Sequence, residues 1–398
     1  MADGNKSSSS HAPPEVELLL CSARTEVGME RAARINALLQ QPINWEYLLD
    51  MAFRHALVPL LYRQLNRAGL QLVPEPTIAR LQNEFAANTV RNILLTRELG
   101  RILEVCEEQG IPVIPYKGPA LAIQAYGDAA LRQFSDLDLL VYEGDADRAA
   151  QTLLSIGYRS HYQTSRKPLA NYVRLLCEQG FVRGDDGVYV EIHWATAPRY
   201  ISSYLDAEVY WGRAEKITIE GRSALALSIE DLLLTLCVHA GKHQWERLAW
   251  VCDLNETISK SPSIRWEQLI EEGQRTKTRR MLYLGLYLAN ELLGTTLPEA
   301  ILSEARAEPS VLSLASEVRR RFFLQIHRPY APLEAMRFQV KVRERILDGL
   351  RSCYYSQIPP TPADLSAVSL PNALSFLYYL LRPIRLIKKH TLGSVEKT

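Results

Sequence analysis

Apolar residues recur at three- and four-residue spacings near both ends of the chain, which is the periodicity of an amphipathic helix. Between Glu15 and Gly110 prolines divide this pattern into several segments, and the longest expected helix covers Ile78 to Glu108. The same spacing returns after Ile229. The later helices are expected over Glu230–His243, Leu248–Ile258, Trp266–Glu272 and Thr278–Leu293. Residues 15–110 and 229–398 are therefore predicted to be two helical regions.

The pattern changes between these regions, over residues 111–228. Short β-branched or alternating segments predict strands, and one intervening segment that ends at Gly157 predicts a helix. The expected strands are Ile111–Tyr116, Asp136–Val141, Tyr158–Tyr162, Glu178–Arg183 and Val188–Trp194, with the helix at Asp145–Gly157. The last two strands would form a hairpin through a Gly-rich turn. A small mixed sheet with helices, flanked by helical regions, is an α+β fold.

Composition narrows the classes of function that fit this fold. Forty-six basic and 45 acidic residues give a net charge of +1, so no overall field favours long nucleic acid as a partner. The six cysteines form no CxxC pair, which predicts free thiols and a cytoplasmic location. Residues 1–14 are polar and Ser-rich and are predicted to be a disordered tail.

One C-terminal segment, Leu374–Ile387, is apolar and ends in basic residues. Pro383 interrupts it, and it is too short to span a membrane. A packed terminal helix with cations reaching solvent is expected, rather than a peripheral membrane contact. The oligomeric state has no signal in the sequence.

Three acidic residues are the strongest candidates for chemistry. Asp136 and Asp138 lie two residues apart on an expected strand, so both carboxylates point to one face. Glu191 and His193 alternate with apolar residues on another expected strand and share a face in the same way. Carboxylate oxygens that converge on one sheet face can hold a divalent cation such as Mg²⁺ or Mn²⁺.

A turn at Lys117-Gly118 precedes these carboxylates. It joins an expected strand to an expected helix that opens at Pro119, a favoured first helical position. Helix N-terminal amides bind phosphate, and Lys117 would add a positive charge. Arg132, four residues before Asp136, is a further phosphate ligand candidate, with a surface arginine as the alternative.

The order of these motifs resembles the uncharacterised, or type 5, bacterial nucleotidyltransferases of the DNA polymerase β-like superfamily. The resemblance extends to Asp231-Leu-Leu-Leu, to His239-Ala-Gly-Lys242-His243 and to a segment that ends at Asp253. It implies a polymerase-β-like core, an NTP co-substrate with ATP expected, and metal ions held by Asp136, Asp138 and Glu191. It also implies that Lys117 and Gly118 hold the triphosphate.

The chain departs from the wider superfamily at this turn, because Lys-Gly-Pro stands where Gly precedes a small hydroxyl residue. His239 and His243 have a spacing that can bind zinc, but the glutamate of HExxH is missing, so structural histidines are expected. His193, His239, Lys242, His243 and Asp253 are possible residues of the cleft between the α/β and helical regions.

These residues predict an enzyme that moves an NMP, with AMP expected, from an NTP to a hydroxyl of a small-molecule or protein acceptor. Pyrophosphate is the other product. An inactive nucleotide-binding or interaction module of the same fold is the main alternative. A kinase ranks lower, because neither a Walker sequence nor the protein-kinase motifs are present.

Overall fold

A computed structural model describes residues 12–357 except 162–166, 185–186, 202–206 and 327, together with a few positions between 368 and 385. The predicted tail and the basic-apolar segment at Leu374–Ile387 therefore lie largely outside the described residues. Within the described part of the chain, no helix combines the length and the apolar character needed to cross a membrane.

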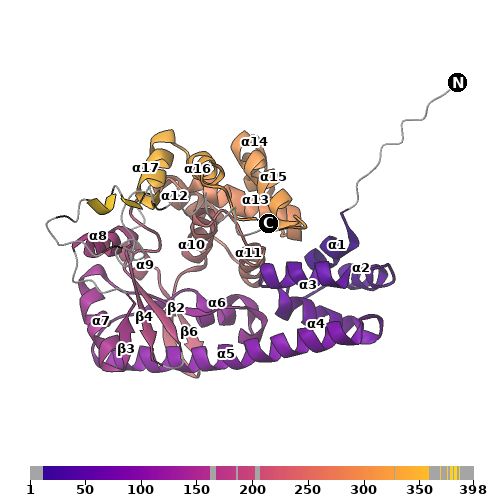
Figure 1. The fold of residues 1–398 in the computed structure, drawn as a ribbon, viewed down its shortest axis with the longest axis horizontal. Helices are drawn as coiled ribbons and strands as arrows, with labels where there is room; N and C mark the ends of the chain where they lie inside the picture. The colour runs from indigo at the N-terminus through magenta and orange to yellow at the C-terminus, as the bar shows by residue number, and fades with distance from the viewer. Residues whose placement is uncertain are drawn as a thin grey trace.

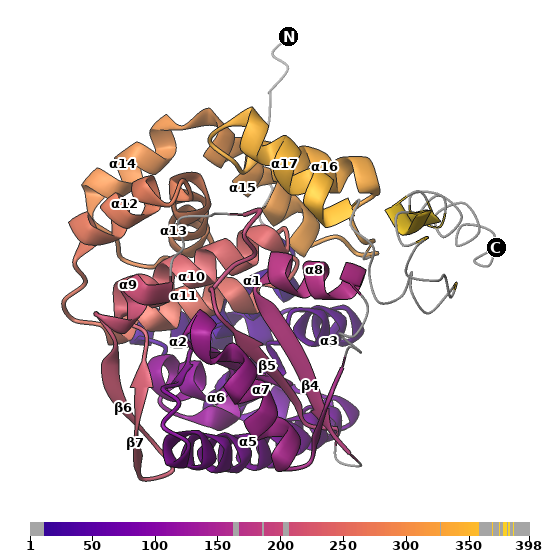
Figure 2. The same ribbon diagram turned by 90° about the vertical axis from the view of Figure 1, so that its left-hand side faces the viewer.

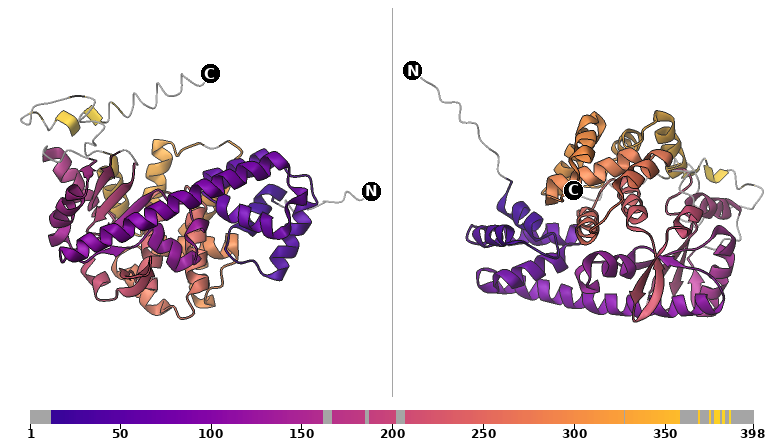
Figure 3. Two further views of the ribbon diagram at one scale, coloured as in Figure 1. Left: turned by 90° about the horizontal axis from the view of Figure 1, so that it is seen from below. Right: turned by 180° about the vertical axis from the view of Figure 1, so that it is seen from behind.

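The N-terminal region is helical, as its periodicity predicts. Asn44 caps the third helix by accepting a hydrogen bond from the Tyr47 amide. The helices are α1 (Pro14–Ser22), α2 (Met29–Leu39), α3 (Trp45–Arg54), α4 (Val58–Ala68) and α5 (Glu75–Glu108), with a 3₁₀ turn at Leu70–Leu72. Helix α5 has 34 residues and runs from this helical group to the far side of the sheet (Figures 1 and 3).

The central sheet has five strands in the order β1-β2-β5-β4-β3. Strands β2 and β5 are parallel, whereas the other neighbours are antiparallel, so the sheet is mixed as expected. The strands are β1 (Ile114–Pro115), β2 (Asp136–Leu140), β3 (Tyr158–Ser160), β4 (Glu178–Arg183) and β5 (Tyr189–His193). Each predicted strand is found, and the predicted hairpin is β4–β5.

One face of the sheet is apolar and the other is polar. Leu137 and Leu139 of β2 and Val190 and Ile192 of β5 pack into a core with side chains of α5 and α7 (Ala146–Ser155). A short helix α6 (Gly118–Leu121) follows β1 and continues as a π-helix, Ala122–Tyr126. Helix α8 (Lys167–Leu176) precedes β4, and α9 (Ala207–Trp211) follows β5. Short 3₁₀ turns lie at Ala129–Leu131 and Glu143–Asp145.

A second hairpin, absent from the sequence prediction, joins the sheet to the C-terminal helices. Strands β6 (Glu215–Ile219) and β7 (Arg222–Ala226) are antiparallel, and Ile219 and Ala224 enter the core of the α5 side. Glu220 and Gly221 form the turn, both with positive φ. This is the backbone of a two-residue hairpin turn, which glycine accommodates.

The C-terminal region is again helical. The four expected helices are α10 (Ile229–Lys242), α11 (Ala249–Lys260), α12 (Trp266–Arg275) and α13 (Arg279–Leu293). They are followed by α14 (Glu299–Ala307), α15 (Pro309–Phe322), α16 (Pro332–Lys341) and α17 (Ile346–Gln357). Ser228 caps α10 through the Asp231 amide. Helices α10 and α11 lie next to the sheet (Figure 2).

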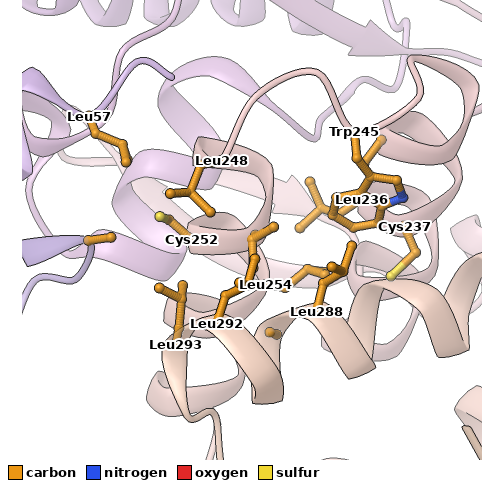
Figure 4. Close-up of a cluster of buried hydrophobic side chains, with 14 of the residues drawn as sticks. Leu57, Leu236, Cys237, Trp245, Leu248, Cys252, Leu254, Leu288, Leu292 and Leu293 are labelled. Carbon is orange, nitrogen blue, oxygen red and sulfur yellow. The ribbon is translucent and has the colours of Figure 1, made fainter. Parts of the chain in front are cut away.

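The N-terminal and C-terminal helical regions share one hydrophobic core. Leu57 lies at one end of the group drawn in Figure 4, on the side of Leu248 and Cys252, and Trp245 lies at the opposite end. The buried His55 ring links the two regions: its Nδ1 accepts from the Leu248 amide at 3.2 Å, so Nε2 donates to the Phe322 carbonyl at 2.8 Å. The structure therefore confirms an α+β fold with a small mixed sheet and flanking helices.

Candidate active site

The register of two parallel strands brings the predicted carboxylates together. Asp138 of β2 lies opposite Glu191 of β5, and Asp136 lies opposite Tyr189. Since alternate residues of a strand share a face, Asp136, Asp138, Glu191 and His193 all project from the polar face. One ligand atom each from Asp138, Glu191 and His193 lies within 4.8 Å of the others.

Two cationic groups lie among these carboxylates. The Lys117 Nζ is 2.7 Å from Asp138 Oδ1, and the His193 Nε2 is 3.1 Å from the same oxygen. His193 Nε2 is also 3.2 Å from Glu191 Oε2. Burial alone would lower the pKa of His193, but hydrogen bonds to Asp138 and Glu191 outweigh it and raise the pKa to about 9. The imidazole is therefore protonated at neutral pH.

The same contacts divide the carboxylates into two kinds. Burial opposes ionisation of Asp138, yet Lys117 and His193 hold its pKa well below the usual range. Burial and the neighbouring Asp138 instead raise the pKa of Asp136. No hydrogen bond or ion pair to the Asp136 carboxylate occurs within the described residues. Asp136 therefore carries the carboxylate best placed to accept an additional cation.

The turn at Gly118 packs against the backbone of Asp136, at the start of the strand that carries two of the carboxylates. Gly118 has φ of +52°, and a Cβ atom built there would lie 2.8 Å from the Asp136 backbone carbonyl. Glycine is thus required by the chain itself, because both the left-handed backbone and the contact exclude a side chain. Gly118 is buried and absent from the residues that line the cavity above Asp136, whereas Lys117 is among them.

Arg132 points its guanidinium at Asp253 of α11. Its Nε and Nη2 donate to the two carboxylate oxygens of Asp253 at 2.8 and 3.0 Å, and the Tyr126 hydroxyl donates to the same group at 2.7 Å. Asp253 is almost fully buried. These contacts tie the segment before β2 to the helical region, and they occupy the arginine that the sequence suggests as a phosphate ligand.

Helices α10 and α11 form the wall opposite the carboxylates. A cavity of about 390 Å³ lies between this wall and the polar sheet face. From α10, α11 and the loop between them it is lined by His239, Lys242, His243, Glu246, Arg247 and Trp250. Burial lowers the pKa of His243 to about 3 and that of His239 well below its ordinary value, so both rings are neutral.

His239 and His243 pack against each other and against the Trp250 ring. The His239 and His243 ring centroids are 4.8 Å apart, and Trp250 meets His239 edge-on at 5.3 Å. Within the described chain, Lys242 and Arg247 form no ion pair. This wall therefore combines flat neutral rings with two cations and the carboxylate of Glu246.

The sequence interpretation missed several lining residues, among them Arg247 and Trp250 of the helical wall and, on the sheet side, Glu178 and Tyr116. Glu178 opens β4, lies opposite His193, and its Oε2 is 3.8 Å from His193 Nδ1. Tyr116 stands beside Asp138 and meets the His193 ring edge-on at 5.5 Å. Alternation along β4 places Glu178 on the polar face, so its signal was present. Tyr116 lies just beyond a two-residue strand, where no alternation can be read.

Comparison with known proteins assigns the chain to a family. No curated protein matches it. The solution structure of the antibiotic-resistance factor ANT(2'')-Ia is similar with 16% sequence identity and a TM-score of 0.30, over 57% of this chain and 98% of that chain. A family model described as uncharacterised nucleotidyltransferase matches residues 41–294, which include the sheet and both walls of the cavity. Because the match spans more than half of the chain, the protein belongs to this family of nucleotidyltransferases, enzymes that transfer a nucleoside monophosphate.

Proposed function

We propose that the protein transfers an NMP from a Mg²⁺-bound NTP to a hydroxyl group of a small-molecule or protein acceptor and releases pyrophosphate. ATP is the expected donor. The observation that carries this proposal is the in-register pairing of the buried Asp138 with Glu191, which together with Asp136 lines a cavity whose opposite wall presents Lys242 and Arg247. Carboxylates and cations on facing walls suit a triphosphate with its metal ions.

The donor set fits a hard divalent cation. Asp138 and Glu191 belong, with His193, to one cluster of possible ligand atoms, and Asp136 adds a carboxylate with no ion-pair partner among the described residues. Carboxylate oxygens are the ligands that Mg²⁺ and Mn²⁺ prefer. Asp136, Asp138 and Glu191 would hold the metal. When bound, the metal would neutralise phosphate charge and lower the pKa of the acceptor hydroxyl.

The cations of this chain would hold the phosphates. Lys117 contacts Asp138 at the floor, whereas Lys242 and Arg247 reach the cavity from the helical wall without an ion-pair partner in the described chain. We assign the triphosphate contacts to Lys117, Lys242 and Arg247, in place of Arg132, whose guanidinium binds Asp253. The neutral rings of His239, His243 and Trp250 offer flat surfaces against which a base can stack.

His193 would act by positioning the carboxylates. Its Nε2 lies between the Asp138 and Glu191 oxygens, so it fixes both groups on the polar face. Glu191 would accept the proton of the attacking hydroxyl, which lies on the same floor. Attack in line with the departing pyrophosphate requires no covalent enzyme intermediate.

The test has two steps. First, binding of a non-hydrolysable ATP analogue is measured by thermal shift with and without Mg²⁺. Stabilisation that needs Mg²⁺ is expected for the wild type and is expected to vanish in Asp138→Asn, while Arg320→Ala, an exposed control on α15, keeps it.

The second step identifies the transferred group. The protein is incubated with a small-molecule extract and ATP labelled at either the α- or the γ-phosphate. Nucleotidyl transfer predicts that the acceptor becomes labelled from α-labelled ATP alone, while the γ label leaves in pyrophosphate. An acceptor that carries only the γ label would show phosphoryl transfer and overturn the proposal.

A further inference from the structure

A second cavity, of about 630 Å³, borders Ser135, the residue that precedes Asp136. It lies between α5 and the β4–β5 hairpin, and Ser135 lines both this cavity and the one above Asp136. Its volume is in the range of sites that hold small molecules. Because Ser135 lines both cavities and is directly bonded to Asp136, this residue marks the border between the second cavity and the acidic floor.

Arginines dominate the lining of this cavity, so we name it the arginine cavity. Arg91, Arg97 and Arg101 of α5 and Arg183 of β4 contribute to it, against the one carboxylate of Glu98. Arg101 and Arg183 each bind Glu98, with nitrogen–oxygen distances of 2.6 Å. Among the described residues that line the cavity, four arginines therefore face one carboxylate.

Two of the arginines have no such partner. Arg91 and Arg97 lie on exposed turns of α5 and form no ion pair with any residue that the structure describes. The Glu98 carboxylate is held in place by a further hydrogen bond from the Tyr158 hydroxyl, 2.8 Å long, so it is not available to them. Guanidinium groups bind phosphate and carboxylate through paired N–H donors.

The arginine cavity also has an apolar side. Leu94 lies between the two unpaired arginines along α5, and its side chain is 57% exposed although it lines the cavity. Leu95 and Val188 complete this apolar lining. A leucine held open to solvent between arginines suits a ligand with both an acidic group and a hydrocarbon portion.

We propose that the arginine cavity binds the acceptor, and that the acceptor is a hydroxyl compound with a phosphate or carboxylate group and an apolar portion. This inference rests on the proposed function. Its acidic group would lie against Arg91 and Arg97, and its hydroxyl would reach past Ser135 to the acidic floor. There the hydroxyl oxygen forms a bond to the α-phosphorus, the bond from that phosphorus to the β-phosphate oxygen breaks, and pyrophosphate leaves. The hydroxyl proton passes to Glu191.

Binding of a small probe tests the site directly. Phenyl phosphate and benzoate combine an acidic group with an apolar ring, and phenol is the neutral control. Isothermal titration of the full chain is expected to show saturable binding of one or both anions and none of phenol. Arg91→Ala/Arg97→Ala should weaken anion binding at least tenfold, Arg91→Lys/Arg97→Lys should weaken it less, and Arg320→Ala should leave it unchanged.

A second measurement tests whether the site serves the acceptor. With Mn²⁺ present, proton relaxation of the bound probe should be enhanced in the wild type and not in Asp138→Asn, which still binds the probe. Absence of anion binding, equal binding by the double alanine variant, or binding without Mn²⁺-enhanced relaxation would each overturn the inference. Binding of the ATP analogue is measured separately on the same variants, so failure of the nucleotide site is distinguishable from failure of the arginine cavity.

Discussion

Replacement of Gly118 by alanine tests how the turn below the carboxylates supports them. Two costs arise from the new methyl group. The left-handed backbone, with φ of +52°, costs alanine about 1–2 kcal/mol. The Cβ atom would also lie 2.8 Å from the Asp136 carbonyl, and relief of this overlap costs about 1–3 kcal/mol more. Gly118→Ala should therefore destabilise the protein by about 2–5 kcal/mol.

The matched control is Gly127→Ala. Gly127 has φ of +70°, but a Cβ atom there meets nothing within 4 Å. It should carry the backbone cost alone, about 1–2 kcal/mol. The difference between the two variants isolates the contact with Asp136. Urea unfolding followed by circular dichroism measures both free energies.

The same pair of variants reports on the site. Relief of the overlap moves the start of β2, so Gly118→Ala should also weaken Mn²⁺ binding severalfold in a paramagnetic resonance titration, whereas Gly127→Ala should not. Displacements well below 1 Å are enough to impair a coordination site. Equal stability losses in the two variants, together with unchanged Mn²⁺ affinity, would refute the reasoning.

Three further predictions concern the walls of the cavity. Asp253→Asn should lower the free energy of unfolding by about 3–5 kcal/mol, because Arg132 loses a buried bidentate partner. Arg132→Gln should then cost less stability in the Asp253→Asn background than in the wild type. Additive losses of the two variants in urea titrations would contradict this pairing. The folded-state pKa of His243 is about 3, below its unfolded value, so its contribution to stability is complete above pH 6.5 and is lost as the pH falls. The loss of unfolding free energy between pH 7.5 and pH 5 should therefore be smaller in His243→Gln than in the wild type, by at most about 2 kcal/mol. Identical pH dependence of the two proteins would count against a buried neutral ring. Glu191→Gln should abolish Mn²⁺ binding, whereas Glu178→Gln, farther from the carboxylate pair, should weaken it only modestly; a reversed order in calorimetric titration would place the metal elsewhere.

Local patterns predicted the elements of the site well. Asp136 and Asp138 share a face because they alternate with leucines, and Glu191 and His193 share one for the same reason. The alternation does not determine which strands are neighbours. The parallel register that sets Glu191 against Asp138 is fixed by packing of the whole sheet, and the resemblance to a family supplied that expectation.

Contacts between distant residues had no local signal. Arg132 and Asp253 are 121 positions apart, so nothing near Arg132 indicates that its guanidinium binds a buried carboxylate and not a phosphate. The β6–β7 hairpin is different, because Ile217 and Ile219 alternate before a Glu-Gly turn and this pattern is readable. The sequence therefore does contain a local signal for this hairpin.

Because the first and last helices share one core, the N-terminal helices of a newly made chain cannot complete their native contacts until the C-terminal helices have been synthesised. The hydrogen bond of His55 to Phe322 can form only after Phe322, which is 267 positions later in the chain, has been synthesised. At about 5–20 residues per second, the ribosome needs roughly 10–50 s to supply that partner. Throughout this interval the first helices can pack against one another, but the surfaces that α13 and Phe322 cover in the native fold stay exposed. We therefore expect chaperones to bind the nascent N-terminal quarter of the chain. A fragment that ends before α13 would keep the same apolar surface exposed permanently.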